Sequence, residues 1–240
     1  QDLRAYFLTL QYWLASSDDN LSRMVRFLVD RYADGERAAW RGALDTAMPI
    51  DYPELGVYHP RMRKRLSDRL ADLPKPRKTA QGSVGLLIMR SYVLAGNTAH
   101  YDAMIQALED HGLHVITAFA SGLDARPAVR QFFMQDGQAS VDAVISLTGF
   151  SLVGGPAYND AKAAEDILAE LDVPYIAAQP VEFQSLKQWE GSEQGLLPLE
   201  ATMMVAIPEL DGATGPVVYG GRGQAAVALQ RDHHRGRGLL

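Results

Sequence analysis

The feature that most constrains this chain is an alternation of short apolar segments with amphipathic stretches. The apolar segments lie at residues 83–89, 113–119, 141–147 and 174–178, and helical patterns begin near Thr98, Arg126 and Tyr158. Two neighbouring parallel strands need a crossover of about a dozen residues or more, which a helix supplies. The pattern therefore predicts an α/β domain built on a doubly wound, flavodoxin-like parallel sheet with helices on both faces.

The first part of the chain is expected to be helical. Apolar residues at positions 3, 6, 7, 10 and 13 or 14 have the spacing of a helix stripe that covers a core, and polar residues 16–20 can cap a second helix over 21–32. A third helix is expected at about 61–73, before the proline-rich linker 74–78. We therefore expect a helical segment over 1–74 and the flavodoxin-like domain over 75–222.

The last third of the chain alternates less clearly. After Pro180 we expect a short helix near 186–190, an apolar segment over 199–207 and a strand over 217–219. Residues 223–240 hold His233 and His234 among arginines and glycines and are expected to form a poorly packed tail.

Composition excludes several classes of protein. Apolar residues make up 47% and charged residues 22%, which is typical of a globular domain. The longest apolar run, 84–89, is too short to cross a bilayer, so no transmembrane segment is expected. The net charge of −6 argues against nucleic acid as a partner. The absence of cysteine excludes thiolate metal sites and fits a reducing compartment, so a cytoplasmic location is expected. The chain opens at Gln1 without a signal-peptide pattern, which indicates an excised piece.

Ligands of open parallel sheets bind beyond the carboxyl ends of the strands, which selects the loops 90–98, 120–124, 148–155 and 179–184. These loops contain neither GxGxxG nor a glycine loop followed by Lys-Ser/Thr, so turns that need glycine are a better interpretation than nucleotide binding. His100 is expected in the first turn of a helix beside a strand end. It is either a site residue or a surface position.

Carboxylates gather around the apolar run of the last third. Glu200 interrupts this run, and Glu209 and Asp211 follow it. A carboxyl group at the edge of an apolar cavity has a raised pKa and can transfer protons. Alternatively, Glu200 is an N-terminal helix charge, and Asp211 with Gly212 forms a turn.

Several ordered motifs resemble the large, porphyrin-binding subunit of magnesium chelatases, most closely the bacteriochlorophyll type. They are SLTGFSLVGGPAYND at 146–160, LDVPY at 171–175, PVEFQ at 180–184, PELDG at 208–212, GVYHP at 56–60 and RSYVLAGN at 90–97. The resemblance covers about residues 1–222. Residues 223–240 depart from it, which implies a truncation or a foreign tail.

The resemblance implies insertion of Mg²⁺ into protoporphyrin IX in (bacterio)chlorophyll synthesis, with this chain an internal fragment of the porphyrin-binding subunit. Two AAA+ partner subunits would hydrolyse ATP to drive the insertion. Magnesium favours oxygen ligands, which suits a chain without cysteine. The large subunit of a cobaltochelatase of cobalamin synthesis, or a scaffold that only docks partners, remains an alternative.

The resemblance also implies roles for individual residues. Glu209, Asp211 and Glu182 are the expected catalytic carboxylates, and Glu209 is the expected metal ligand. The expected porphyrin contacts are Arg90, Tyr92, His100, Thr148, Phe150, Ser151 and Gln184.

Overall fold

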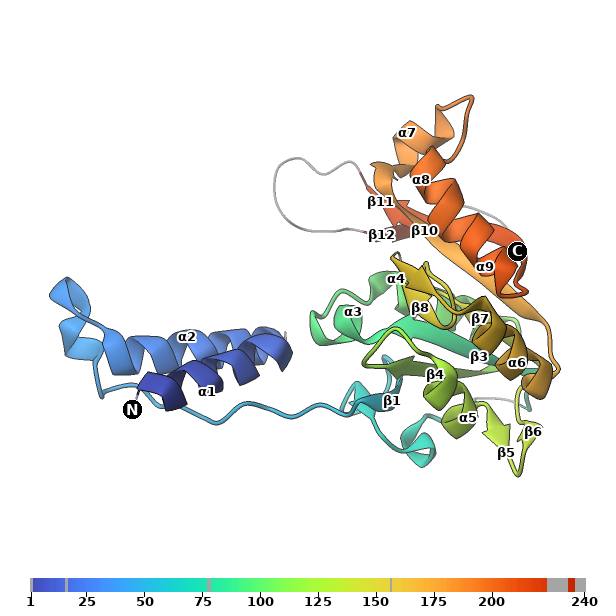
Figure 1. Cartoon of the computed structure of the whole chain (residues 1–240). Helices are drawn as coiled ribbons and strands as arrows, with labels where there is room; N and C mark the ends of the chain where they lie inside the picture. Colours follow the sequence, from blue (N-terminus) through green and yellow to red (C-terminus); the bar gives the residue numbers. More distant parts are fainter. Residues whose placement is uncertain (1, 16, 77–78, 156, 224–232, 236–240) are drawn as a thin grey trace. The chain divides into compact units, whose positions relative to one another are not determined.

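The computed structural model describes residues 2–15, 17–76, 79–155, 157–223 and 233–235 (Figure 1). The chain forms two compact units. One comprises Gln1–Pro53 with Ser91–Asn97, and the other comprises Glu54–Arg90 with Thr98–Leu240. The division near Pro53 lies upstream of the boundary expected at 74, because the strands that follow Pro53 pair with the sheet.

The first unit is a pair of helices, α1 (Asp2–Ala15) and α2 (Asp18–Tyr32), followed by a 3₁₀ helix, Gly35–Trp40. Both predicted α-helices are confirmed, and Ser17 caps α2 by accepting a hydrogen bond from the Asn20 amide at 3.1 Å. The buried Asn20 side chain also exchanges two hydrogen bonds with the Ile50 backbone. This exchange fixes the segment after the helices to α2.

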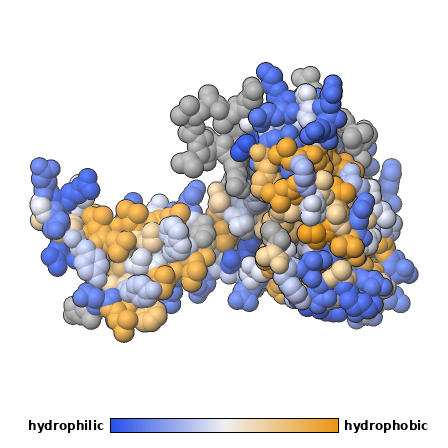
Figure 2. All heavy atoms as spheres, turned by 45° about the horizontal axis from the view of Figure 1, so that its top comes forward, coloured by the Kyte–Doolittle hydropathy of each residue, from blue (hydrophilic) through white to orange (hydrophobic). Residues whose placement is uncertain are grey.

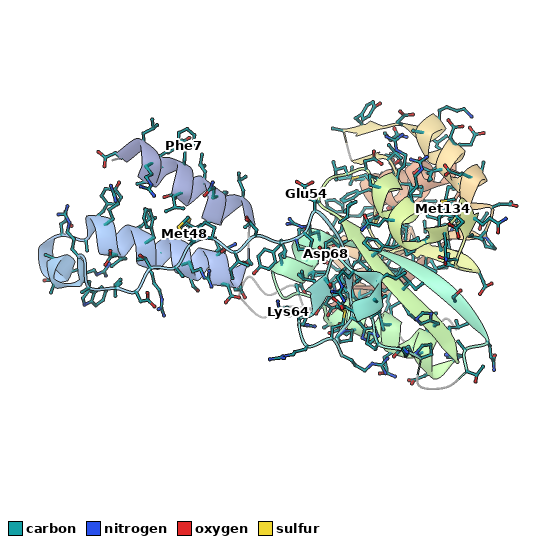
Figure 3. All side chains as sticks on the ribbon, turned by 90° about the horizontal axis from the view of Figure 1, so that it is seen from below. Phe7, Met48, Glu54, Lys64, Asp68 and Met134 are labelled. Atoms are coloured by element: carbon teal, nitrogen blue, oxygen red, sulfur yellow. The ribbon has the colours of Figure 1, made fainter. Side chains whose placement is uncertain are left out.

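The prediction that the apolar stripe of α1 covers a core is wrong. Most of its large side chains are exposed, and the buried residues of this helix are Ala5 and Tyr12. Figure 2 shows apolar side chains along the surface of the helical unit, and Figure 3 shows Phe7 on the side of α1 that faces away from α2. A unit this small has too little interior to bury both sides of a helix pair. Among the described residues, no helix is long and apolar enough to cross a membrane.

The second unit is built on one sheet with the strand order β12-β11-β10-β7-β3-β4-β1-β2. The strands are β1 (Leu55–Tyr58), β2 (Leu66–Ser67), β3 (Gly82–Met89), β4 (Leu113–Ala120), β7 (Ala143–Ser146), β10 (Tyr175–Ser185), β11 (Thr214–Arg222) and β12 (His233–Arg235). The inner strands β11, β10, β7, β3 and β4 are parallel. Their order matches the flavodoxin-like arrangement 2-1-3-4-5, so the predicted fold class is confirmed.

Helices cover both faces of this sheet. They are α4 (Ala99–Asp110), α5 (Arg126–Phe132) and α6 (Ala161–Leu171), and the short α3 (Arg90–Leu94) directly follows β3. Leu87 and Ile116 form one core cluster with buried residues of α5 and α6. Leu86 and Ile88 point to the opposite face, because side chains alternate along a strand. On that face α4 packs against β4. Small hairpins, β5 (Met134–Gln135) with β6 (Gln138–Ala139) and β8 (Gly154–Gly155) with β9 (Tyr158–Asn159), complete the loops.

The third predicted helix, over 61–73, is wrong. This segment holds β2 and a short 3₁₀ turn, Leu70–Asp72. Ion pairs hold it against α4, because Arg61 meets Glu109 at 2.5 Å and Arg65 meets Asp102 at 3.1 Å. Helix propensity is a weak preference that such tertiary contacts override.

The last third contains α7 (Leu186–Glu190) and a continuous helical run of α8 (Pro198–Ala201), a π-helical turn (Thr202–Ala206) and α9 (Ile207–Leu210). Pro208 explains the π turn, because proline lacks the amide donor and its ring clashes with the carbonyl four residues earlier. In the π turn, the Ile207 amide donates to the Thr202 carbonyl, five residues back, and not to the carbonyl four residues back as in an α-helix. The expected tail lies largely outside the described residues; of its described residues, Gly223 and β12, the strand β12 pairs antiparallel with β11.

We predict that Gly56→Ala destabilises the chain, because a Cβ at Gly56 would lie 2.6 Å from both the Phe119 ring and the Ser67 carbonyl oxygen. Overpacking of this kind costs about 1–3 kcal/mol, or about 2–4 °C in Tm for each kcal/mol in a chain of this size. Gly122→Ala is the matched control, because a Cβ there meets open space. Thermal unfolding followed by circular dichroism measures both variants. Equal Tm values would mean that β1 is not held in the sheet as described.

Candidate functional site

The candidate site lies at the carboxyl ends of β3, β4 and β7. The order of the parallel strands reverses around β3, because β4 lies on one side of it and β7 on the other. Crevices at such switch points are where open α/β sheets bind ligands. The loops that follow these three strands enclose a small hollow, and Thr148, Phe150 and Ser151 all contribute to its wall. The structure therefore brings three of the seven expected porphyrin contacts together.

The hollow is too small for a porphyrin. Its free volume is about 30 Å³, room for a water molecule or two. Pockets for ligands of drug size have roughly 300–1,000 Å³. Within the described residues, this hollow is therefore a small gap between loops that has no room for a porphyrin ring.

Asp211 anchors one of these loops from a distant part of the chain. It follows α9, is 1% exposed, and accepts a hydrogen bond from the Leu152 amide at 2.7 Å. Burial raises the pKa of Asp211, and the hydrogen bonds from Leu152 and the Ser151 side chain offset part of this rise. Its other carboxylate oxygen, Oδ1, has no hydrogen-bond partner among the described residues. Asp211 is thus a buried carboxyl that fixes the loop after β7.

Glu200 is a second buried carboxyl, with no exposed surface. It accepts hydrogen bonds from the Phe183 amide at 3.2 Å, the Gln184 side chain at 2.6 Å and the Leu197 amide at 2.9 Å. The helix-terminus interpretation of Glu200 is therefore the right one, since it is the third residue of α8 and bonds back to the residue that caps it. Gln184 also donates to the Gly195 carbonyl oxygen, so both residues fasten the end of β10 to the following loop.

The three expected catalytic carboxylates differ in their surroundings. Glu209 is exposed on α9, Glu182 is half-buried on β10, and Asp211 is buried. Within the part of the chain that the structure describes, no cluster of three or more acidic or histidine side chains could hold a metal ion. The geometry therefore does not assemble a metal centre from these carboxylates.

The remaining expected porphyrin contacts do not line this hollow. His100 is 6% exposed in the first turn of α4, and its ring packs on Tyr101 and stacks 6.2 Å from Tyr219 of β11. His100 is therefore a core side chain of the sheet unit.

Arg90 and Tyr92 lie in the first turn of α3. Arg90 belongs to the sheet unit and Tyr92 to the helical unit.

Comparison with known proteins places these features in a family. The sequence model of the CobN/Magnesium Chelatase family matches residues 10–236, beyond residue 222, where the resemblance was expected to end. The chain is 54% identical over 229 residues to the magnesium-chelatase H subunit of Rhodobacter capsulatus, covering 95% of this chain and 19% of the relative. It is 55% identical over 222 residues to the H subunit of Cereibacter sphaeroides, covering 92% of this chain and 18% of the relative. The chain thus spans about a fifth of the length of these relatives.

A solved structure has the same fold. The catalytic subunit of cobaltochelatase from Mycobacterium tuberculosis matches with a TM-score of 0.63 and 25% identity, covering 91% of this chain and 17% of that chain.

We predict that Asp211→Asn changes the pH dependence of stability. Burial raises the folded-state pKa of Asp211 above its ordinary 3.8, so its contribution to stability is present below the unfolded pKa and is lost as pH rises through the folded pKa. Asparagine does not titrate, so the Tm of the variant relative to wild type should be higher at about pH 8 than at about pH 4.

Thermal unfolding of both proteins across this range measures the effect. Glu209→Gln, which changes an exposed carboxyl, is the control and should follow wild type. A constant Tm difference between Asp211→Asn and wild type would contradict the assigned pKa shift.

Proposed function

The chain belongs to the CobN/magnesium chelatase family, and we propose that it forms part of the H subunit of a magnesium chelatase, which binds protoporphyrin IX while Mg²⁺ is inserted. The 54% identity over 229 residues to a magnesium-chelatase H subunit carries this proposal. Mg²⁺ and protoporphyrin IX are its substrates, and two AAA+ partner subunits hydrolyse the ATP that drives insertion. The proposed location is the cytoplasm.

The proposed chemistry needs carboxylates in contact with water. Insertion replaces two pyrrole N–H protons of the porphyrin by one Mg²⁺, so the site must accept two protons and handle a hydrated ion. We assign the metal-delivering and proton-accepting role to Glu209, which is exposed beside the exposed Leu210. Glu182 is the proposed second acceptor, and Asp211 supports the site by fixing the loop after β7.

The porphyrin contacts are proposed in two groups. Arg90, Thr148, Phe150 and Ser151 lie at the carboxyl edge of the sheet and are proposed to contact the ring or its substituents, and Tyr92 is proposed as a contact on the resemblance alone. His100 and Gln184 are buried in internal contacts and are proposed to act by positioning their neighbours. The small hollow favours a segment that forms one wall of the porphyrin site.

A cobaltochelatase large subunit is the second candidate, since the solved cobaltochelatase structure has the same fold with a TM-score of 0.63. Its 25% identity is less than half of that to the magnesium-chelatase relatives. Titration of the chain with protoporphyrin IX, followed by quenching of its tryptophan fluorescence, tests the proposal. Saturable quenching supports a porphyrin-binding wall, and a preference for a cobalamin-type ring would favour the second candidate.

We predict that the 240-residue chain alone does not insert Mg²⁺ when given ATP and protoporphyrin IX. It spans about a fifth of the H-subunit relatives, and its sequence has no glycine loop followed by Lys-Ser/Thr for nucleotide phosphates. The fluorescence of magnesium protoporphyrin measures turnover, with a complete chelatase as the positive control. Turnover by the chain alone would refute the assignment to a multi-subunit enzyme.

We predict that Glu209→Gln in a complete H subunit that carries this segment lowers the insertion rate by about 10²–10⁴, the usual effect of losing a general acid or base. Porphyrin affinity should change little, because the apolar contacts remain. Glu165→Gln is the control, because Glu165 is exposed on α6 in a surface ion pair. Insertion rate, porphyrin affinity and Tm are measured on each variant. A purely structural role would lower affinity and Tm together, and a normal rate would remove Glu209 from the chemistry.

A further inference from the structure

One side of helix α1 exposes large apolar side chains. They recur at the spacing of a single helix face, and each is more than half exposed: Leu3, Tyr6, Phe7, Trp13 and Leu14. Figure 3 shows Phe7 on the side of α1 that faces away from α2, and Figure 2 shows apolar side chains along the surface of this unit. Single exposed apolar residues need no explanation, whereas a contiguous apolar face marks an interaction site. We call these five residues the outer face of α1.

The opposite side of the same helix is already buried. Ala5 and Tyr12 are 4% and 1% exposed. The Tyr12 ring lies 5.9 Å from the Phe27 ring of α2, and its hydroxyl donates to the Ala47 carbonyl oxygen at 2.6 Å. Helix α1 is therefore apolar on both sides, and a helix that is apolar all round is normally enclosed by other elements. Within the helical unit, only the side with Ala5 and Tyr12 is covered.

Helix α2 is different, because its own outer side is polar. Asp18, Ser22 and Arg26 share one face of this helix and are exposed beside Val25. In α1, by contrast, no charged residue occurs over positions 5–15. The outer side of α2 therefore suits contact with water, and the outer face of α1 suits contact with another apolar surface.

The composition of the outer face indicates a permanent neighbour. Surfaces that associate reversibly are about as polar as the rest of a protein surface, whereas permanent interfaces resemble a domain core that has been cut in half. The outer face consists of three aromatic and two leucine side chains, which matches the second description. The chain spans about a fifth of the length of the H-subunit relatives, so about four fifths of such a subunit lie outside it and can supply this neighbour.

We propose that the outer face of α1 packs against an apolar surface of the H subunit that lies outside this chain. The proposal rests on the proposed function, because it takes the chain as part of an H subunit. It makes the helical unit an internal layer of that subunit, and not a docking surface for the AAA+ partner subunits or for a second copy of the chain.

Hydroxyl-radical footprinting, read by mass spectrometry, tests the proposal on the 240-residue chain and on a complete H subunit that carries this segment. Phe7 is 56% exposed, and burial to below about 5% should lower its labelling about tenfold in the complete subunit. Val25 is the matched control, because it is 55% exposed on the polar side of α2. Its labelling should be the same in both proteins.

A variant tests the contact directly. Phe7→Asp in the complete subunit places a charge at the proposed contact. A buried charge without a partner is costly, so the contact should open and the labelling of Leu14 should rise about tenfold, to its level in the chain. Val25→Asp is the control variant and should leave Leu14 protected. The wild-type footprint decides the question even where Phe7→Asp does not fold.

Equal labelling of Phe7 in the chain and in the complete subunit would overturn the proposal. So would protection of Phe7 in the chain itself, or protection that begins only when the AAA+ partner subunits are added. The footprint is independent of porphyrin chemistry. A complete subunit that supports Mg²⁺ insertion while Phe7 stays exposed would overturn the contact alone, and one that protects Phe7 without supporting insertion would overturn the proposed function alone.

Discussion

The candidate site depends on the pairing of β3 with a parallel strand on each side. The pairing with β4 runs without a shift from Gly82 opposite Leu113 to Met89 opposite Ala120. On the other side, Leu87 lies opposite Ser146 of β7. The chain therefore leaves all three strands at one edge of the sheet, and the loops that follow have to meet there. Gly85 supports this arrangement, since a Cβ there would lie 2.9 Å from the Phe133 ring after α5.

Two of the three acidic residues at the end of the chain's last apolar run, Glu200 and Asp211, are buried and stabilise loops, whereas Glu209 is exposed to solvent. Glu200 is buried with three hydrogen-bond donors, and Asp211 is buried with the Leu152 amide on one oxygen. A buried polar group that loses its partner costs about 1–3 kcal/mol, so both carboxyls tie their loops firmly. Glu209 lies between them in sequence and is exposed. The π turn before Pro208 changes the angular spacing of the residues along this helical run.

Sequence patterns predicted the fold well where the contacts are local or strictly periodic. Four apolar segments became β3, β4, β7 and β10, and the polar residues before α2 included its cap, Ser17. The patterns failed where distant contacts decide, as in residues 61–73. Ion pairs to α4 hold this segment as turns around β2 and a short 3₁₀ helix. They also could not show which acid is buried, because Glu200, Glu209 and Asp211 belong to one apolar context in the sequence.

Magnesium chemistry gives a reason to separate these roles within the proposed function. Mg²⁺ releases its water ligands reluctantly and usually keeps several of them when it binds a protein. A carboxylate that receives the hydrated ion must therefore face water, as Glu209 does. Asp211 meets the opposite condition, because burial raises its pKa and so favours the neutral form over the charged form that binds a cation. The division between exposed and buried acids thus supports the proposal that Glu209 on α9 delivers the ion, while Asp211 holds the loop after β7.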